Sequence, residues 1–421
     1  MIELLSLIVF SALIVFYLML VGVLVFPKKV KHNYSFFPKL SILIPAHNEE
    51  KMIEKCVKSI SEANYLNEIE IIVLNNGSTD DTEKVVRKLM KTIPNLKLLN
   101  LNHIGKASAL NKGIKVAKND VIVTVDADSI IEKNALLELV QPLAQENVGG
   151  VTGVIRAIRN KNPLTWFQDF EYVLSSGWRY VCTKMNGNII LPGFAAFKKQ
   201  AILKAGGFSK DTLTEDYDIA LSLKKAGYQT ITILSALLYT EVPQNLGGII
   251  KQRIRWARGT FQVIKKHLNF IISKRSESIK FFSIPTQVFW YVYSLLYLPV
   301  TFYTMFGGYF QYFLSHGIIV SSSVIKYFFS WFSLYGMAEM IYKLLLGYLS
   351  INLMNALIVF AFTLSLIYNM SLWARLSLKI EDVLIYFFYF PYALLILSVL
   401  GSSFLYELLT RRPKAYNLWT E

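Results

Sequence analysis

Residues 121–128 read VIVTVDAD, a short apolar run that ends in two aspartates separated by one residue. Two similar runs precede it, LSILIP over residues 40–45 and EIIVL over residues 70–74, and polar residues follow each of them. An apolar run of this length without alternation is typical of a strand buried on both faces of a parallel sheet. We therefore predict three strands of one such sheet.

Helical patterns lie between these runs, over residues 49–63, 80–90 and 106–117. Strands that alternate with helices predict an α/β fold with a mostly parallel sheet. In such a fold, ligands bind where the strands end at their carboxyl edge. The polar segments that follow the three runs are therefore expected to meet in one site. They are residues 46–49 (AHNE), 75–78 (NNGS) and 126–128 (DAD).

Asp126 and Asp128 are the residues of these segments that most clearly indicate a function, the binding of a metal ion. At a strand end, two carboxylates at this spacing can reach one hard cation. Mg²⁺ or Mn²⁺ is commonly bound by one or two carboxylates together with substrate phosphates. An isolated pair of this kind is usually a solvated turn, so the prediction of a divalent metal site depends on the strand that precedes it.

The composition indicates a membrane protein with a polar middle. Of 421 residues, 53% are hydrophobic and only 17% are charged, whereas about a quarter are charged in soluble domains. Residues 27–280 hold 37 basic and 23 acidic residues, and the apolar ends hold few charges. Anionic lipid and an anionic substrate explain this basic block, because no nucleic-acid-binding motif accompanies it. Two cysteines are too few for a disulfide framework.

Five membrane spans are predicted. Residues 3–26 carry no charge after Glu3, and the acidic start favours a retained anchor over a cleaved signal peptide. Three charge-free runs follow residue 280, and the first is long enough to hold one span over residues 284–310 and to begin a second, which ends near Glu339 and Lys343. Basic residues follow the first span, precede the second and follow the last, which predicts a multi-pass cell-membrane protein with a cytoplasmic middle block.

The predicted domains are a membrane helix (1–27), an α/β domain (38–250), interfacial helices (251–283), four membrane helices (284–410) and a cytoplasmic tail (411–421). Two further motifs fall in the polar block, TEDYD at residues 214–218 and QRIRW at residues 252–256. In the second, Gln252, Arg255 and Trp256 share one helical face. A guanidinium suits a diphosphate and an indole suits a sugar ring, although a basic amphipathic helix at the membrane surface fits the same stretch.

Together the motifs resemble a family of membrane-embedded inverting glycosyltransferases, family 2, which includes cellulose, chitin, hyaluronan and poly-N-acetylglucosamine synthases. The matching order is PAHNEE, NNGSTDDT, GKASALN, DAD, TED and QRIRW, over roughly residues 38–262. The resemblance implies a Rossmann-like domain of the GT-A type joined to a helical membrane bundle. It also implies a nucleotide-sugar donor and Mg²⁺ or Mn²⁺.

The resemblance also implies roles for individual residues. Asp216 would be the general base, with a pKa raised by Glu215 and by burial, and Asp126 and Asp128 would hold the metal. The implied donor-binding residues are Pro45, Ala46, Glu49, Asn76, Lys106 and Arg255. The implied acceptor-binding residues are Glu215, Gln252, Trp256 and Gly193.

The chain departs from the family at Asn75 and Asn76, where acidic residues are usual. An Asn amide can still pair with uracil, so a UDP-linked donor remains favoured. Three functions stay open. A processive synthase would elongate a β-linked polysaccharide and export it through its own bundle. A single-transfer enzyme would glycosylate a lipid such as a polyprenyl phosphate or a ceramide-like acceptor. An inactive transporter or assembly subunit is disfavoured by the intact carboxylates.

Overall fold

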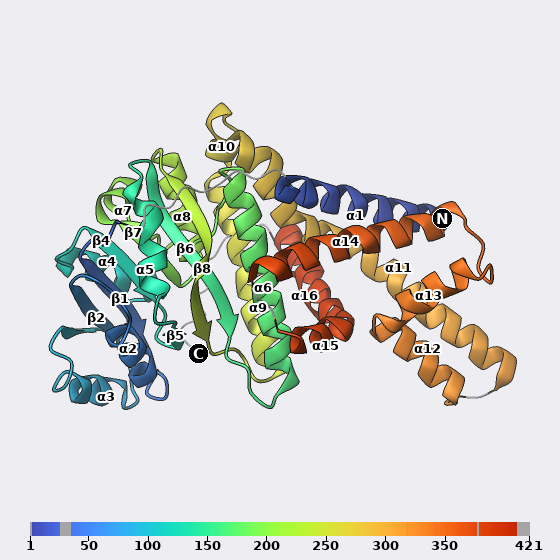
Figure 1. Ribbon diagram of the computed structural model, residues 1–421, viewed down its shortest axis with the longest axis horizontal. Coiled ribbons are helices and arrows are strands. Elements are labelled where there is room, and N and C mark those ends of the chain that lie inside the picture. The colour runs from blue at the N-terminus through green and yellow to red at the C-terminus, as the bar shows by residue number, and fades with distance from the viewer. Residues whose placement is uncertain (1, 26–34, 318, 377–378, 411–421) are drawn as a thin grey trace. The chain divides into compact units, whose positions relative to one another are not determined.

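The computed structural model describes residues 2–25, 35–317, 319–376 and 379–410 (Figure 1). The chain forms two compact units, which we call the sheet unit and the helical unit. Of the described residues, the sheet unit comprises 35–244 and Arg258–Ser283, and the helical unit comprises 2–25, Asn245–Ala257, 284–317, 319–376 and 379–410. The predicted C-terminal tail and the lysines that follow the first span lie outside the described residues.

The sheet unit contains an eight-stranded sheet with the order β3-β2-β1-β4-β7-β6-β8-β5. Its strands are β1 (Leu40–Ala46), β2 (Ile69–Asn76), β3 (Leu96–Leu101), β4 (Val121–Val125), β5 (Ser129–Ile131), β6 (Val148–Ala157), β7 (Phe194–Lys198) and β8 (Gln229–Thr240). The three predicted strands are β1, β2 and β4, and β1 lies between the other two, parallel to both. The α/β prediction is therefore confirmed.

The other half of the sheet is mixed rather than mostly parallel. β7 is antiparallel to both β4 and β6, and β5 is antiparallel to β8, whereas β6 and β8 are parallel. The parallel half determines where the site lies, because Ala46 of β1 pairs with Asn75 of β2, and Asn75 pairs with Asn100 of β3. The three strand ends are thus level with one another.

Helices cover both faces of the sheet. Alternate residues of β1 face opposite sides, since Ile42 packs with α2 and α5 while Leu43 packs with α4 and α8. The helices of this unit are α2 (Ile53–Ser61), α3 (Thr82–Leu89), α4 (Lys106–Val116), α5 (Ala135–Val140), α6 (Pro163–Lys184), α7 (Lys199–Ala205), α8 (Glu215–Lys225) and α10 (Leu268–Ile271). The predicted helices over 49–63, 80–90 and 106–117 correspond to α2, α3 and α4. α9 (Leu246–Lys266) begins in the helical unit and ends in the sheet unit.

Four helices among the described residues are long and apolar enough to cross a membrane: α1 (Ile2–Val25), Ile279–His316, which contains α11 (Ile284–His316), α14 (Leu353–Leu376) and α16 (Tyr389–Leu409). Within the helical unit, α1 packs against α14 and α11, and the Phe16 ring stacks on that of Phe289 at 4.2 Å. A short helix, α15 (Glu381–Phe387), precedes α16.

The span predicted to end near Glu339 and Lys343 differs from expectation. Two helices of 11 residues occupy this stretch, α12 (Ser322–Phe332) and α13 (Tyr335–Leu345). Each is about 16 Å long at 1.5 Å per residue, shorter than the roughly 30 Å hydrocarbon core. The helix breaks at Ser333, whose backbone is extended. The described residues therefore provide four long helices rather than the five expected.

Candidate active site

A lysine bridges two of the predicted site carboxylates at the carboxyl edge of the sheet. The Lys106 ammonium lies 2.6 Å from Asp126 Oδ1 and 3.0 Å from Glu215 Oε1. Lys106 begins α4, Asp126 follows β4, and Glu215 begins α8, so three separate motifs meet here. Burial opposes the charge on Lys106, but the two carboxylates outweigh it and raise the pKa of this amine above its usual range.

Asp128 lies in a second polar environment. The hydroxyls of Ser129 and Thr240 donate to its Oδ1 over 2.9 and 3.0 Å. Burial, with the charge of Asp126 next in importance, raises the pKa of Asp128 to about 6. Two carboxylates that disfavour each other's charge are stabilised by a shared cation, so the pair fits a divalent ion.

The rest of the coordination shell has no obvious protein source. Within the described ranges, no group of three His, Cys, Asp or Glu side chains is arranged to hold a metal ion. At many magnesium sites, one or two carboxylates are joined by substrate phosphates and water.

Gly193 lies directly against the Asp126 carboxylate. Its backbone carbonyl accepts a hydrogen bond from the Asp126 N–H at 3.2 Å. A Cβ built on Gly193 would lie 1.9 Å from Asp126 Oδ2, which is far too close for a carbon and an oxygen that are not bonded to each other. The residue expected near the acceptor thus also shapes the space beside a carboxylate that was predicted to bind the metal.

Hydrogen bonds join the segments expected to bind the nucleotide. The Asn76 backbone carbonyl lies 3.0 Å from His47 Nδ1 and 3.2 Å from His103 Nδ1, and the two imidazole centroids are 4.5 Å apart. The Asn76 side-chain oxygen accepts from the Ile104 N–H at 2.9 Å. The ends of β1 and β2 and the loop before α4 are therefore held together around Asn76.

The end of β1 brings another carboxyl group to this edge. Pro45 and Ala46 are the last residues of the strand, and the Glu49 N–H donates to Thr82 Oγ1 at 2.8 Å. Burial, followed by the charge of Asp128, raises the pKa of Glu49 to about 8. This shift favours the protonated form of Glu49, which can donate a hydrogen bond to a ligand oxygen.

Asp216, the expected base, lies half-buried in the first turn of α8, where the Tyr217 N–H donates to its Oδ1 at 2.9 Å. Burial lowers the pKa of Arg179, on α6, to about 10, and the charge of Asp216 offsets part of this effect. The Glu215 carboxylate, which was expected to raise the pKa of Asp216, is paired with Lys106.

Gln252, Arg255 and Trp256 are all half-buried on the part of α9 that belongs to the helical unit. Sequence reasoning missed Arg253 between them. This residue is 2% exposed, donates to Gln252 Oε1, and lies 4.3 Å from the centroid of the Trp256 ring. It also donates to the Tyr392 hydroxyl at 3.3 Å. Arg253 therefore covers one face of the indole, and its i, i+3 spacing from Trp256 was the signal in the sequence that could have found this contact.

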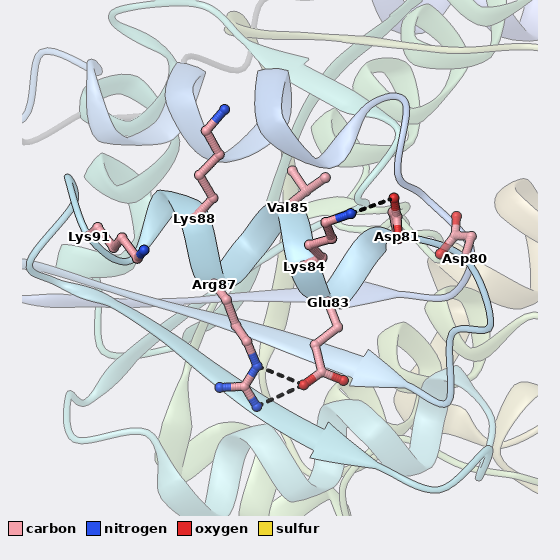
Figure 2. A pocket seen from close by; sticks show the side chains of 8 residues that line it. All are labelled: Asp80, Asp81, Glu83, Lys84, Val85, Arg87, Lys88 and Lys91. Atoms are coloured by element: carbon pink, nitrogen blue, oxygen red, sulfur yellow. Dashed lines mark hydrogen bonds and ion pairs between the residues drawn. The ribbon is translucent and has the colours of Figure 1, made fainter.

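A surface pocket of the sheet unit lies over α3 (Figure 2), and neither Asp126 nor Asp128 is among the residues that line it. The side chains that line it are Asp80, Asp81, Glu83, Lys84, Val85, Arg87, Lys88 and Lys91. Arg87 and Lys84 pair there with Glu83 and Asp81 at 2.7 and 3.4 Å (Figure 2). These exposed pairs are typical of a solvated helix face, and we assign no function to them.

The fold and the convergent carboxylates define a GT-A-type glycosyltransferase domain combined with apolar helices that could span a membrane.

Residues 41–205 match the family model for glycosyl transferase family 2. Over 279 residues the chain is 30% identical to the poly-β-1,6-N-acetyl-D-glucosamine synthase of Staphylococcus aureus (strain COL), covering 64% of this chain and 67% of the relative. The synthase of the same name from Staphylococcus epidermidis is 32% identical over 240 residues, covering 56% of this chain and 58% of the relative.

The chain therefore belongs to glycosyltransferase family 2 and is a glycosyltransferase. Among solved structures, the mannosyltransferase of Pyrobaculum calidifontis, in complex with GDP-Man and Mn²⁺, is similar, with a TM-score of 0.61 and 23% sequence identity. The likeness covers 87% of this chain and 99% of that chain, which shows that the two share a fold.

Proposed function

We propose that this glycosyltransferase elongates a β-linked polysaccharide from a UDP-sugar, and that UDP-N-acetylglucosamine is the first donor to test. The observation that carries the proposal is the meeting of Lys106, Asp126 and Glu215 at one strand edge. The similarity to two poly-β-1,6-N-acetyl-D-glucosamine synthases favours a polymer product.

In the proposed reaction, Asp126 and Asp128 hold Mg²⁺ or Mn²⁺, which supplies positive charge to the donor diphosphate. Lys106 and Arg255 bind the same diphosphate and stabilise the charge that develops as the nucleotide leaves. Asp216 accepts the proton of the acceptor hydroxyl, which attacks the anomeric carbon from the face opposite the leaving group. A single displacement inverts the anomeric centre and converts an α-linked donor into a β-linkage.

Binding of the two substrates is assigned to the residues around these groups. Asn76 would hydrogen-bond the base, Pro45 and Ala46 would line the nucleotide pocket, and Glu49 would donate to a donor oxygen. Gln252, Glu215 and Gly193 would border the acceptor, and the free face of Trp256 would carry its terminal sugar ring.

The proposed location is the cell membrane, with the sheet unit in the cytoplasm. Lys265, Lys266, Lys274, Arg275 and Lys280 lie just before or within the first turn of the long helix Ile279–His316, which supports this orientation by the positive-inside rule. Because four rather than five long helices are described, the side on which the chain ends needs its own test. Labelling of single cysteines placed at Lys274 and at Gly347 in intact cells, with a membrane-impermeant reagent, distinguishes the two sides.

The function is tested by supplying membranes with a panel of nucleotide sugars and analysing the products. A polymer made from one UDP-sugar supports the proposal. One sugar attached to an extractable lipid would replace it with the lipid-glycosylating alternative. No transfer from any donor would favour an inactive subunit.

A further inference from the structure

Asp218 is a wholly buried carboxylate two residues beyond the expected base, and it takes no part in the site at the strand edge. It is 0% exposed, and its oxygens lie 2.8 Å from Lys266 Nζ and 2.8 Å from His267 Nε2. The Thr212 hydroxyl donates to it at 3.0 Å. Burial acts to raise the pKa of Asp218, but the hydrogen bonds from His267 and Lys266 hold that pKa below its usual value.

The two groups that pair with Asp218 lie at the end of α9, Lys266 as its last residue and His267 directly after it. The same side of this helix makes two further contacts with the segment that leads into α8. Gln262 Oε1 accepts from the Leu213 N–H at 3.0 Å, and a Cβ on Gly259 would lie 2.5 Å from Thr214 Cγ2. Residues 259, 262 and 266 are spaced i, i+3 and i+7, so they form one face. The second half of α9 therefore rests along the segment that delivers Asp216.

The contacts of Asp218 differ from the packing of Gly259 against Thr214, because they hold a buried charge. A buried carboxylate is costly unless it is paired, and removal of one partner leaves the others uncompensated. A pairing that joins two helices in this way restricts their relative position more strongly than apolar contacts, which tolerate sliding. The junction is therefore expected to fix α9 and the first turn of α8 in one arrangement.

We propose that Asp218, held by Lys266 and His267, is a positioning residue that locks the second half of α9 onto the first turn of α8 and so fixes the orientation of Asp216. This rests on the proposed function, in which Asp216 is the base. α9 is also the helix that carries the QxxRW motif, so the lock anchors that helix at its far end. Loss of the lock should impair the chemical step while the donor still binds.

The test compares Asp218→Asn with wild type in transfer rate, donor KM and affinity for the nucleotide. We expect kcat to fall about 10–100-fold while donor KM and nucleotide affinity change less than threefold. Asp211→Asn is the matched control, because Asp211 also approaches Lys266, at 3.7 Å, but its side chain is 81% exposed. The control should keep wild-type kcat. Wild-type kcat in Asp218→Asn, or an equal loss of donor affinity and kcat, would overturn the proposal.

A second variant covers the case in which Asp218→Asn fails to fold. When Asp218→Asn is combined with Lys266→Met, the uncompensated cation is gone, and the amide introduced at position 218 can still accept a hydrogen bond from His267. Where Asp218→Asn is soluble, the double variant should recover at least fivefold in kcat over it. Where Asp218→Asn is insoluble, the double variant should be soluble and keep at least the kcat of Lys266→Met, and a double variant that is insoluble too would contradict the lock. Purely additive losses would contradict the lock. A wild-type protein that transfers no sugar would instead contradict the proposed function.

Discussion

The Lys106 ammonium lies 2.6 Å from Asp126, the first of the two aspartates expected to bind a metal. In this arrangement a cation from the chain already neutralises part of the charge where a divalent ion would bind. A metal–diphosphate that enters the site would share Asp126 with Lys106, and the amine would then be available to the donor. Lys106 is thus expected to oppose binding of the metal alone and to favour binding of the metal with the donor.

Lys106→Met separates these two effects. Removal of the amine leaves Asp126 and Glu215 without their cation, so the affinity of the protein for Mn²⁺ alone should rise about tenfold. The affinity for the nucleotide sugar should fall by at least tenfold, because one diphosphate contact is lost. Isothermal titration with Mn²⁺, and then with UDP-sugar at saturating Mn²⁺, measures both. If the two affinities change in the same direction, Lys106 does not have this role.

The metal site should depend on pH through Asp128. The carboxylate must be ionised to bind a cation, and its pKa is about 6 in the folded protein because of burial and of Asp126. Affinity for Mn²⁺ should therefore be constant above this value and fall about tenfold per unit as the pH drops below it. Asp128→Asn should weaken Mn²⁺ binding at every pH and remove the inflection near pH 6.

The same site predicts the effect of metal removal. EDTA should abolish transfer, and Mg²⁺ or Mn²⁺ in excess should restore it. Full activity in EDTA would contradict the claim that Asp126 and Asp128 bind a metal ion that transfer requires.

Gly193→Ala should disable the site without unfolding the protein. The new methyl group would lie 1.9 Å from Asp126 Oδ2, so the Asp126 carboxylate would have to rotate away. The fold should survive, because the end of a side chain moves more easily than the backbone does. We expect turnover to fall at least about a hundredfold while the melting temperature changes by only a few degrees. Gly307→Ala is the matched control, because no atom lies within 4 Å of the corresponding Cβ. Equal activity of the two variants would contradict the close packing of Gly193 on Asp126.

Asp216→Asn tests the assignment of the base. The amide keeps the shape of the carboxylate but cannot take a proton, so turnover should fall by about 10²–10⁴-fold. Binding of the nucleotide sugar, measured directly, should stay within about threefold of wild type. A loss of donor binding together with turnover would assign Asp216 to the metal or to the fold instead.

β1, β2 and β4 could be predicted because they are continuous apolar runs followed by polar ends, whereas β3, in the same parallel half, was not predicted. β6 and β7 were missed, since β6 contains Gly149, Gly150 and Gly153, which weaken any strand pattern. These strands pair with partners far along the chain, and such pairing has no local signal. For the same reason the sequence did not predict the antiparallel pairings made by β7 and β5.

The break between α12 and α13 could not be predicted from the sequence either. Ser333 interrupts a stretch with no charged residue nearby, and apolar composition reports the length of a run without reporting whether the helix is continuous. The one serine that ends α12 looks the same in the sequence as serines that lie within helices.

The motif residues that meet at the strand edge were predicted from their order along the chain. The pairing of Asp218 with Lys266 and His267 was not, because 48 and 49 residues separate the partners. Arg253 was missed because it lies inside a motif whose neighbours were given the roles. In both cases burial of a charged side chain, which only the structure shows, is the observation that identifies the residue.

The most direct test of polymer synthesis is the length of the product made at limiting enzyme, with labelled UDP-N-acetylglucosamine followed by a chase of unlabelled donor. A processive synthase is expected to give long chains whose labelled part remains attached to the enzyme and never exchanges with free product. A product that consists of one sugar on an extractable lipid would contradict polymer synthesis.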